Sequence, residues 1–194
     1  MSPANPRRSA LAGPRPGPCL ASAGGLLVLT IAACAHTGAG QAGAPAPSPA
    51  APVTSGPPPV PRPVADEPCG YLSAESVQIA NGQRVTGVRV SATGPGQPYP
   101  ACFFLTYHGA VQLRTWIVVA TPAVARATLD SMAPQATSDL AELPGGWTGG
   151  AQPTAEGAVF AVIRRGTAVV ITTNQRQTIG ARRIAEQVIT ALGL

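Results

Sequence analysis

The sequence contains no lysine, and only two of its 194 residues are histidine. Without lysine, Schiff-base chemistry on a lysine and phosphate binding by a P-loop lysine are excluded. The two histidines, His36 and His108, stand far apart, and no zinc-ligand spacing or hydrolase motif surrounds either of them. The sequence therefore predicts neither a metal site nor a cofactor site.

Charged residues are also scarce, at 11% of the chain, and they are unevenly distributed. Four of the thirteen arginines precede Asp66, whereas all eight acidic residues lie at or after it. Residues 66–194 therefore carry nine arginines against eight acids, a net charge of +1. Such a balance gives no basic footprint for nucleic acid, so we expect no nucleic-acid partner.

The N-terminus lacks an apolar run long enough to anchor the chain permanently. The apolar stretch 20–33 has 14 residues and contains two glycines, whereas a spanning helix needs about 20 apolar residues. Three arginines, Arg7, Arg8 and Arg15, precede it, and small residues end it. A positive flank, a short apolar core and a small-residue cleavage site predict a signal peptide over residues 1–33.

A cysteine directly after this stretch refines the prediction. Ile31-Ala32-Ala33-Cys34 resembles the lipobox of bacterial lipoproteins. The resemblance implies that Cys34 receives a diacylglyceryl group, becomes the new N-terminus and carries acyl chains such as palmitate. Several acyl chains hold a protein at a membrane stably, so we expect an extracytoplasmic protein anchored to the cell membrane by lipid. The alternative is a plain secreted protein in which Cys34 is incidental.

A change of composition near residue 66 divides the rest of the chain. Residues 35–65 hold nine prolines, four glycines and a single charge, which leaves little for a core to bury. We expect residues 34–65 to form a lipidated cysteine and a disordered Ala/Pro/Gly-rich tether, and residues 66–194 to form one globular domain.

Periodicity and end signals predict the elements of that domain. Ser73 can cap a helix that stops at Asn81-Gly82, and Thr121-Pro122 can open another that runs to about Met132. Strands are expected at 85–90, 102–107, 111–120, 159–163 and 168–172, with a hairpin turn at 164–167 and a final helix over 178–192. The order α-β-β-β-α-β-β-α predicts an α+β fold, with a mainly antiparallel sheet of about five strands packed by helices.

Several short motifs of this region resemble a known family. They are Pro68-Cys69-Gly70-Tyr71-Leu72, the run Asn81 to Val88, Pro100-Ala101-Cys102-Phe103-Phe104, Gly145-Gly146-Trp147, Thr173-Asn174-Gln175 and the closing Ala191 to Leu194. Together they resemble an uncharacterised family of secreted actinobacterial proteins, a domain of unknown function found in mycobacteria, corynebacteria and their relatives. The resemblance supports the envelope location and the two-cysteine pattern, and it supplies no catalytic residue.

Two cysteines, Cys69 and Cys102, lie in the predicted domain. An even pair in an oxidising compartment favours a disulfide. A redox-active or nucleophilic cysteine is the alternative, but the sequence has no C-x-x-C motif.

Candidate binding residues stand in the predicted loops. Gly145 to Gly150 places four glycines around Trp147, which can form a binding lip or fold back onto the core. Tyr99 lies in another loop. Asn174 and Gln175 follow a buried strand, where their amides can cap the next helix or face a ligand.

Two functions fit these observations. The first is a non-catalytic envelope module that binds or assists an envelope protein, a lipid or a glycan. The alternative is an envelope hydrolase that uses carboxylates, for which Asp130, Asp139, Glu142 and Glu156 are available. The two differ in whether these acids converge in a cleft.

The lipobox resemblance gives a first prediction. The intact mass of the mature protein should show an acylated N-terminus at Cys34, and Cys34→Ala should release the domain from membranes because the acyl chains are lost. Cell fractionation with mass spectrometry measures both outcomes. An unmodified N-terminus at another residue would contradict the prediction.

Overall fold

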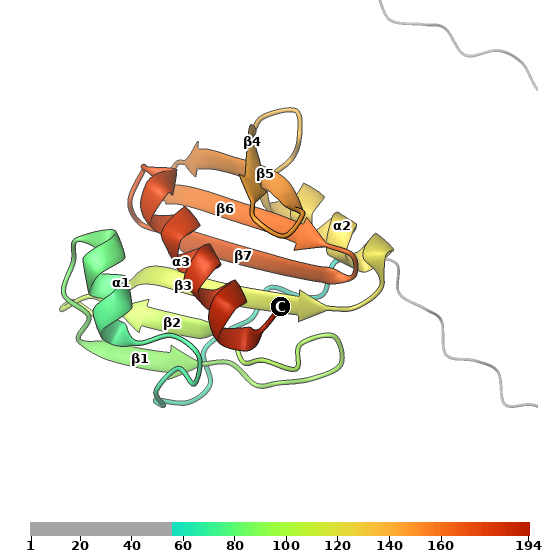
Figure 1. Cartoon of the computed structure of the whole chain (residues 1–194). Helices are drawn as coiled ribbons and strands as arrows, with labels where there is room; N and C mark the ends of the chain where they lie inside the picture. Colours follow the sequence, from blue (N-terminus) through green and yellow to red (C-terminus); the bar gives the residue numbers. More distant parts are fainter. Residues whose placement is uncertain (1–55) are drawn as a thin grey trace, which may run out of the picture. The chain divides into compact units, whose positions relative to one another are not determined.

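The structure, a computed structural model, describes residues 56–194 (Figure 1). They form an α+β domain in which one antiparallel sheet has helices on both faces. The described helices are α1 (Ala74–Asn81), α2 (Pro122–Met132) and α3 (Thr178–Leu192). The described strands are β1 (Gly87–Val90), β2 (Cys102–Leu105), β3 (Val111–Val119), β4 (Asp139–Leu143), β5 (Trp147–Thr154), β6 (Gly157–Arg164) and β7 (Thr167–Thr173).

The seven strands follow the order β1-β2-β3-β7-β6-β5-β4 across the sheet. The central strand β7 alternates its side chains between two cores. Val169 and Ile171 pack on the face that α1 and α3 cover, and Ala168 and Val170 pack on the face that α2 covers. The nearly continuous apolar character of β7 is thus explained by burial on both faces, as expected.

The predicted helix ends are confirmed. The Ser73 hydroxyl accepts a hydrogen bond from the backbone N–H of Ser76 at 3.1 Å, and Thr121 accepts one from Val124 at 3.3 Å. Gly82 ends α1 with a φ of 67°, a left-handed conformation that glycine adopts without a steric penalty. Local capping chemistry therefore determined these boundaries.

The prediction of about five strands was wrong, because the sheet has seven. Residues 139–143 and 147–154, which looked like a glycine-rich loop, form the hairpin β4–β5. Gly150 permits close packing there, since a Cβ at this position would lie 2.8 Å from the Cβ of Ser138. Pro153 is tolerated in β5 because β4 pairs with β5 only as far as Ala151. On the side that faces β4, Pro153 therefore interrupts no hydrogen bonds between strands.

The end of the expected tether contacts the sheet. Val64 and Ala65 donate hydrogen bonds to the carbonyl of Val90, and Val90 donates one back to Ala65 at 2.9 Å. Pro57–Pro59 lie against the connection between β3 and α2. The packed chain thus includes residues before Asp66, the expected start of the domain. Residues 1–33, Cys34 and residues 35–55 lie outside the described part of the chain.

The expected disulfide between Cys69 and Cys102 is confirmed. Cys102 is the first residue of β2 and is fully buried, whereas Cys69 lies in the segment before α1. The bond therefore ties that segment to the sheet. Within residues 56–194, no helix is both long enough and apolar enough to cross a membrane.

The disulfide gives a stability prediction. Replacing both cysteines by alanine should lower the free energy of unfolding by about 3–4 kcal/mol, because a cross-link between residues 33 apart restricts the unfolded chain. Urea denaturation should show a lower midpoint and a steeper slope, as the unfolded chain expands. An unchanged midpoint would show that the bond adds nothing to stability.

Candidate functional site

A cavity of about 520 Å³ opens on the α2 face of the sheet, beyond the C-terminal end of α2. Its walls come from the sheet, from Met132 at the end of α2 and from the turn between β5 and β6. Its polar lining includes Arg114, Glu156, Thr172 and Asn174, besides Gln112, Thr154 and Thr173. The size is typical of a small-molecule site, which measures about 300–1,000 Å³.

One row of residues across four strands forms the floor of this cavity. Phe103 of β2 lies opposite Arg114 of β3, Arg114 lies opposite Thr172 of β7, and Thr172 lies opposite Val159 of β6. Residues paired in this way share a face of the sheet, with Cβ atoms roughly 4.5–5.5 Å apart. A cation and a hydroxyl thus stand at the centre of the row, with an apolar side chain on either side.

Arg114 has no ion-pair partner among residues 56–194. The three ion pairs of the described chain are Arg89–Asp66, Arg126–Asp130 and Arg182–Glu186. The Nε of Arg114 is buried and has no hydrogen-bond partner. Burial lowers the pKa of the guanidinium from its ordinary value, although an arginine remains protonated in proteins. Arg114 is therefore a partly desolvated positive charge at the floor of a cavity, without an ion-pair partner in the described chain.

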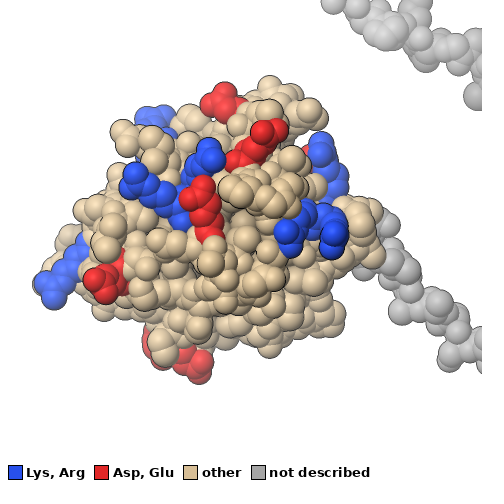
Figure 2. Space-filling model, viewed as in Figure 1, with Lys and Arg blue, Asp and Glu red and all other residues tan. Residues whose placement is uncertain are grey.

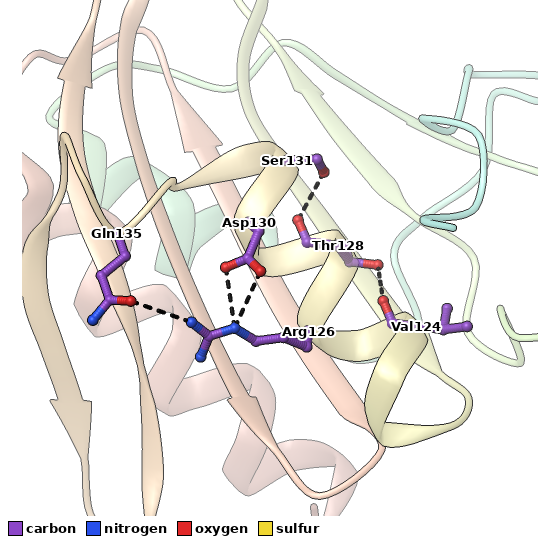
Figure 3. A network of polar contacts seen from close by, with 6 residues as sticks. All are labelled: Val124, Arg126, Thr128, Asp130, Ser131 and Gln135. Carbon is purple, nitrogen blue, oxygen red and sulfur yellow. Dashed lines mark hydrogen bonds and ion pairs between the residues drawn. The ribbon is translucent and has the colours of Figure 1, made fainter. Parts of the chain in front are cut away.

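The end of α2 is held by its own polar contacts. Arg126 bonds Asp130 at 3.1 Å and donates a hydrogen bond to Gln135 at 3.5 Å, while Ser131 donates one to the carbonyl of Thr128 (Figure 3). These contacts connect the last turns of the helix to the segment that follows it.

A network of polar side chains, built on the buried amides of Asn81 and Gln112, lies at the neighbouring end of the sheet. Asn81 donates hydrogen bonds to Gln112 and Asn174, each at 3.1 Å, and accepts one from Thr173 at 2.5 Å. Gln112 donates to the carbonyl of Arg84 at 2.9 Å. The network joins the end of α1 to β3 and β7. The hydrogen bonds named above all run between groups of the protein itself.

The structure places Trp147 in the core. The indole ring is 1% exposed and belongs to the cluster on the α1/α3 face. The guanidinium of Arg164 covers the ring at 4.9 Å from its centre and donates a hydrogen bond to the carbonyl of Gly145 at 3.4 Å. This placement favours the reading of Trp147 as a lid on the core.

The glycines around Trp147 do not form one loop. Gly145 and Gly146 make the turn between β4 and β5, with φ angles of 86° and 83°, whereas Gly149 and Gly150 lie within β5. The expected binding lip is therefore a tight hairpin turn followed by a strand.

The other expected binding residues do not converge with Trp147. Tyr99 precedes β2 and packs edge-on against Tyr71, with 6.5 Å between ring centres, and three strands separate β2 from β5. Asn174 follows the C-terminal end of β7, opposite the end at which Trp147 starts β5. Asn174 and Gln175 do not cap α3, whose N-cap is Gln177. Of these four residues, Asn174 reaches the Arg114 cavity.

The carboxylates do not converge in a cleft among the described residues. Asp130 is paired on α2, Asp139 and Glu142 are exposed on the edge strand β4, and Glu156 is the one carboxylate that lines the Arg114 cavity. Figure 2 shows acidic and basic side chains interspersed over a mostly neutral α1/α3 face. Within residues 56–194, no group of three His, Cys, Asp or Glu side chains could hold a metal ion.

The family of the chain follows from a comparison with family models. Residues 51–194 match the model described as Domain of unknown function (DUF2020). The chain belongs to this family. A comparison with curated proteins finds no match. The DUF2020 match begins before Asp66, as does the packing of the chain on the sheet.

Sequence reasoning missed Arg114, because arginines in a strand are usually read as solvent-facing. A signal was present: Arg114 stands in a strand of nine residues, of which six are buried, namely Gln112, Leu113 and the four from Thr115 to Val118. A long charged side chain inside such a strand of a DUF2020 domain needs either a partner or a cavity.

The position of Trp147 gives a third prediction. Trp147→Ala should lower the free energy of unfolding by about 3–5 kcal/mol, because it leaves a cavity in the core. Leu140→Ala, on the same hairpin but 78% exposed, is the matched control and should change it by roughly 0.5 kcal/mol or less. Equal midpoints for the two variants in urea would contradict the core placement.

Proposed function

We propose that this protein is a lipid-anchored module of the bacterial cell envelope, which binds a partner, a lipid or a glycan outside the cytoplasm and catalyses no reaction. Cys34 would carry the anchor, and the segment after it would hold the domain away from the membrane.

The observation that carries the proposal is the disulfide between Cys69 and Cys102. Disulfides persist in oxidising compartments and are rare in the cytosol. The predicted signal peptide and the lipobox resemblance point to the same side of the membrane. The disulfide lies in the domain, whereas the predicted signal peptide and the lipobox overlap at residues 31–33, so two separate segments of the chain support the same location.

Binding is favoured over catalysis by the arrangement of charged groups. A glycosidase needs two carboxyl groups about 5–9.5 Å apart across the scissile bond. In the described chain, one carboxylate, Glu156, lines the Arg114 cavity, and one, Glu186, lines the groove between α1 and α3. A cavity with a central cation and apolar sides is better suited to holding an anion than to general acid–base chemistry.

Expression of the full chain and of a chain lacking residues 2–33 tests the location. The full chain should sediment with membranes, be cleaved by protease added to intact cells, and resist thiol alkylation at Cys69 and Cys102. The shortened chain should stay inside the cell with reduced cysteines. A full chain with free thiols inside the cell would refute the proposal.

Incubation of the purified protein with envelope lipids and polymers tests the absence of catalysis. We expect no new reducing ends and no released fatty acids by mass spectrometry. Products that form with the unaltered chain and disappear with Glu156→Gln would establish the hydrolase instead.

A further inference from the structure

We propose that the cavity at Arg114 binds a ligand that joins an oxyanion, either a carboxylate or a phosphate ester, to an apolar group. The inference rests on the proposed function, because it supplies the binding module with a class of ligand. The oxyanion would bind the guanidinium of Arg114 and the hydroxyl of Thr172, and the apolar group would lie against Met132 and Val111.

The unpaired charge of Arg114 is the first reason. Removing a charge from water is unfavourable unless a partner or hydrogen bonds compensate for it. Among residues 56–194, Arg114 has no ion pair, and its Nε has no acceptor. An oxyanion in the cavity would supply an ion-pair partner, since a guanidinium binds carboxylates and phosphates through two parallel hydrogen bonds.

The neighbour of Arg114 is the second reason. Thr172 lies directly opposite it on β7, lines the cavity and is half-buried. Within the described chain, the Thr172 hydroxyl makes no hydrogen bond, in contrast to the hydroxyl of Thr173. Two polar groups without hydrogen-bond partners in the described chain are thus adjacent on the same face of the sheet, where one oxyanion can contact both.

The apolar lining of the cavity is the third reason for the proposal. Phe103 and Val159 stand on either side of the polar pair but are only 3% and 2% exposed, so the apolar surface open to a ligand comes from Met132 at the end of α2 and from Val111, which is 44% exposed. A small inorganic anion would leave these walls unused in a cavity of about 520 Å³. A ligand with an apolar group would bury against Met132 and Val111, at roughly 25 cal/mol per Å² of apolar surface removed from water.

A purely structural role for Arg114 makes a different prediction. The aliphatic part of an arginine can cover an aromatic ring while its charge stays in water, and Arg114 is adjacent to Phe103. Arg114→Met keeps that cover and removes the charge, so it separates the two roles.

Glu156 is the opposing charge of the cavity. It makes no ion pair within residues 56–194, and it should repel an anionic ligand.

The test uses the full-length chain carrying Cys34→Ala, isolated with its disulfide intact, and titrates it with octanoate, octyl phosphate and neutral octanol by calorimetry. At least one of the two anions should bind saturably, with amide NMR shifts at Arg114 and Thr172, and octanol should bind much more weakly. Arg114→Met should weaken binding tenfold or more, and Glu156→Gln should strengthen it a few-fold. Arg165→Gln, an exposed control at the far end of the sheet, should stay within twofold.

Stability distinguishes a binding role from a packing role. Arg114→Met should melt at the same or a higher temperature, because an uncompensated charge leaves the interior while the cover of Phe103 remains.

Vesicles of phosphatidylglycerol, compared with vesicles of phosphatidylcholine, test whether a lipid headgroup supplies the oxyanion. Binding to the former that depends on Arg114 would assign that source, and binding of the soluble anions alone would assign a free amphiphile.

Two outcomes would overturn the inference: no saturable binding of either anion or of anionic vesicles, or equal binding by the unaltered chain and Arg114→Met. Neither bears on the location of the protein, which cell fractionation measures separately. A protein that sediments with membranes but binds no anion would lose this ligand class and keep the proposed function.

Discussion

Burial of both faces of the central strands β3 and β7 is the constraint on which the rest of the structure depends. Apolar side chains point to both sides of these strands, so each face needs a helical layer. The α1/α3 side receives two helices, and the other side receives only α2, of 11 residues. At 1.5 Å per residue, α2 is roughly 16 Å long, whereas the nine residues of β3 extend about 30 Å. One end of this face must therefore remain uncovered.

The uncovered end explains the chemistry of the row through Arg114. Under α2, the same strands present Trp116, Val118, Ala168 and Val170. Beyond Met132 the alternation continues with Arg114 and Thr172, which reach the cavity. The change from apolar to polar occurs within one face and within single strands. This change from apolar to polar side chains occurs where α2 ends over the sheet, and the strands continue through it.

Local signals predicted the parts of the fold that local physics determines. The caps Ser73 and Thr121, the stop at Gly82 and the β6–β7 hairpin followed from side-chain and turn chemistry within a few residues. The strands β4 and β5 did not, because their glycines fit close approaches to distant segments, as at Gly150 beside Ser138. The Arg114 cavity was also hidden, since it depends on where α2 ends above the sheet. Trp147 among glycines allowed either a binding lip or a ring folded onto the core, and the ring lies in the core.

Some polar groups near the cavity have hydrogen-bond partners within the protein, and others have none in the described chain. Asn81, Gln112 and Thr173 bond one another and hold α1 to the ends of β3 and β7, so a ligand would gain little by competing for them. Arg114 and Thr172 stand beside this network without partners in the described chain. The satisfied amides make that end of the sheet rigid, and rigidity lowers the entropy lost when a ligand is bound. A fixed scaffold with two adjacent unsatisfied groups on it is the arrangement that an anion-binding site requires.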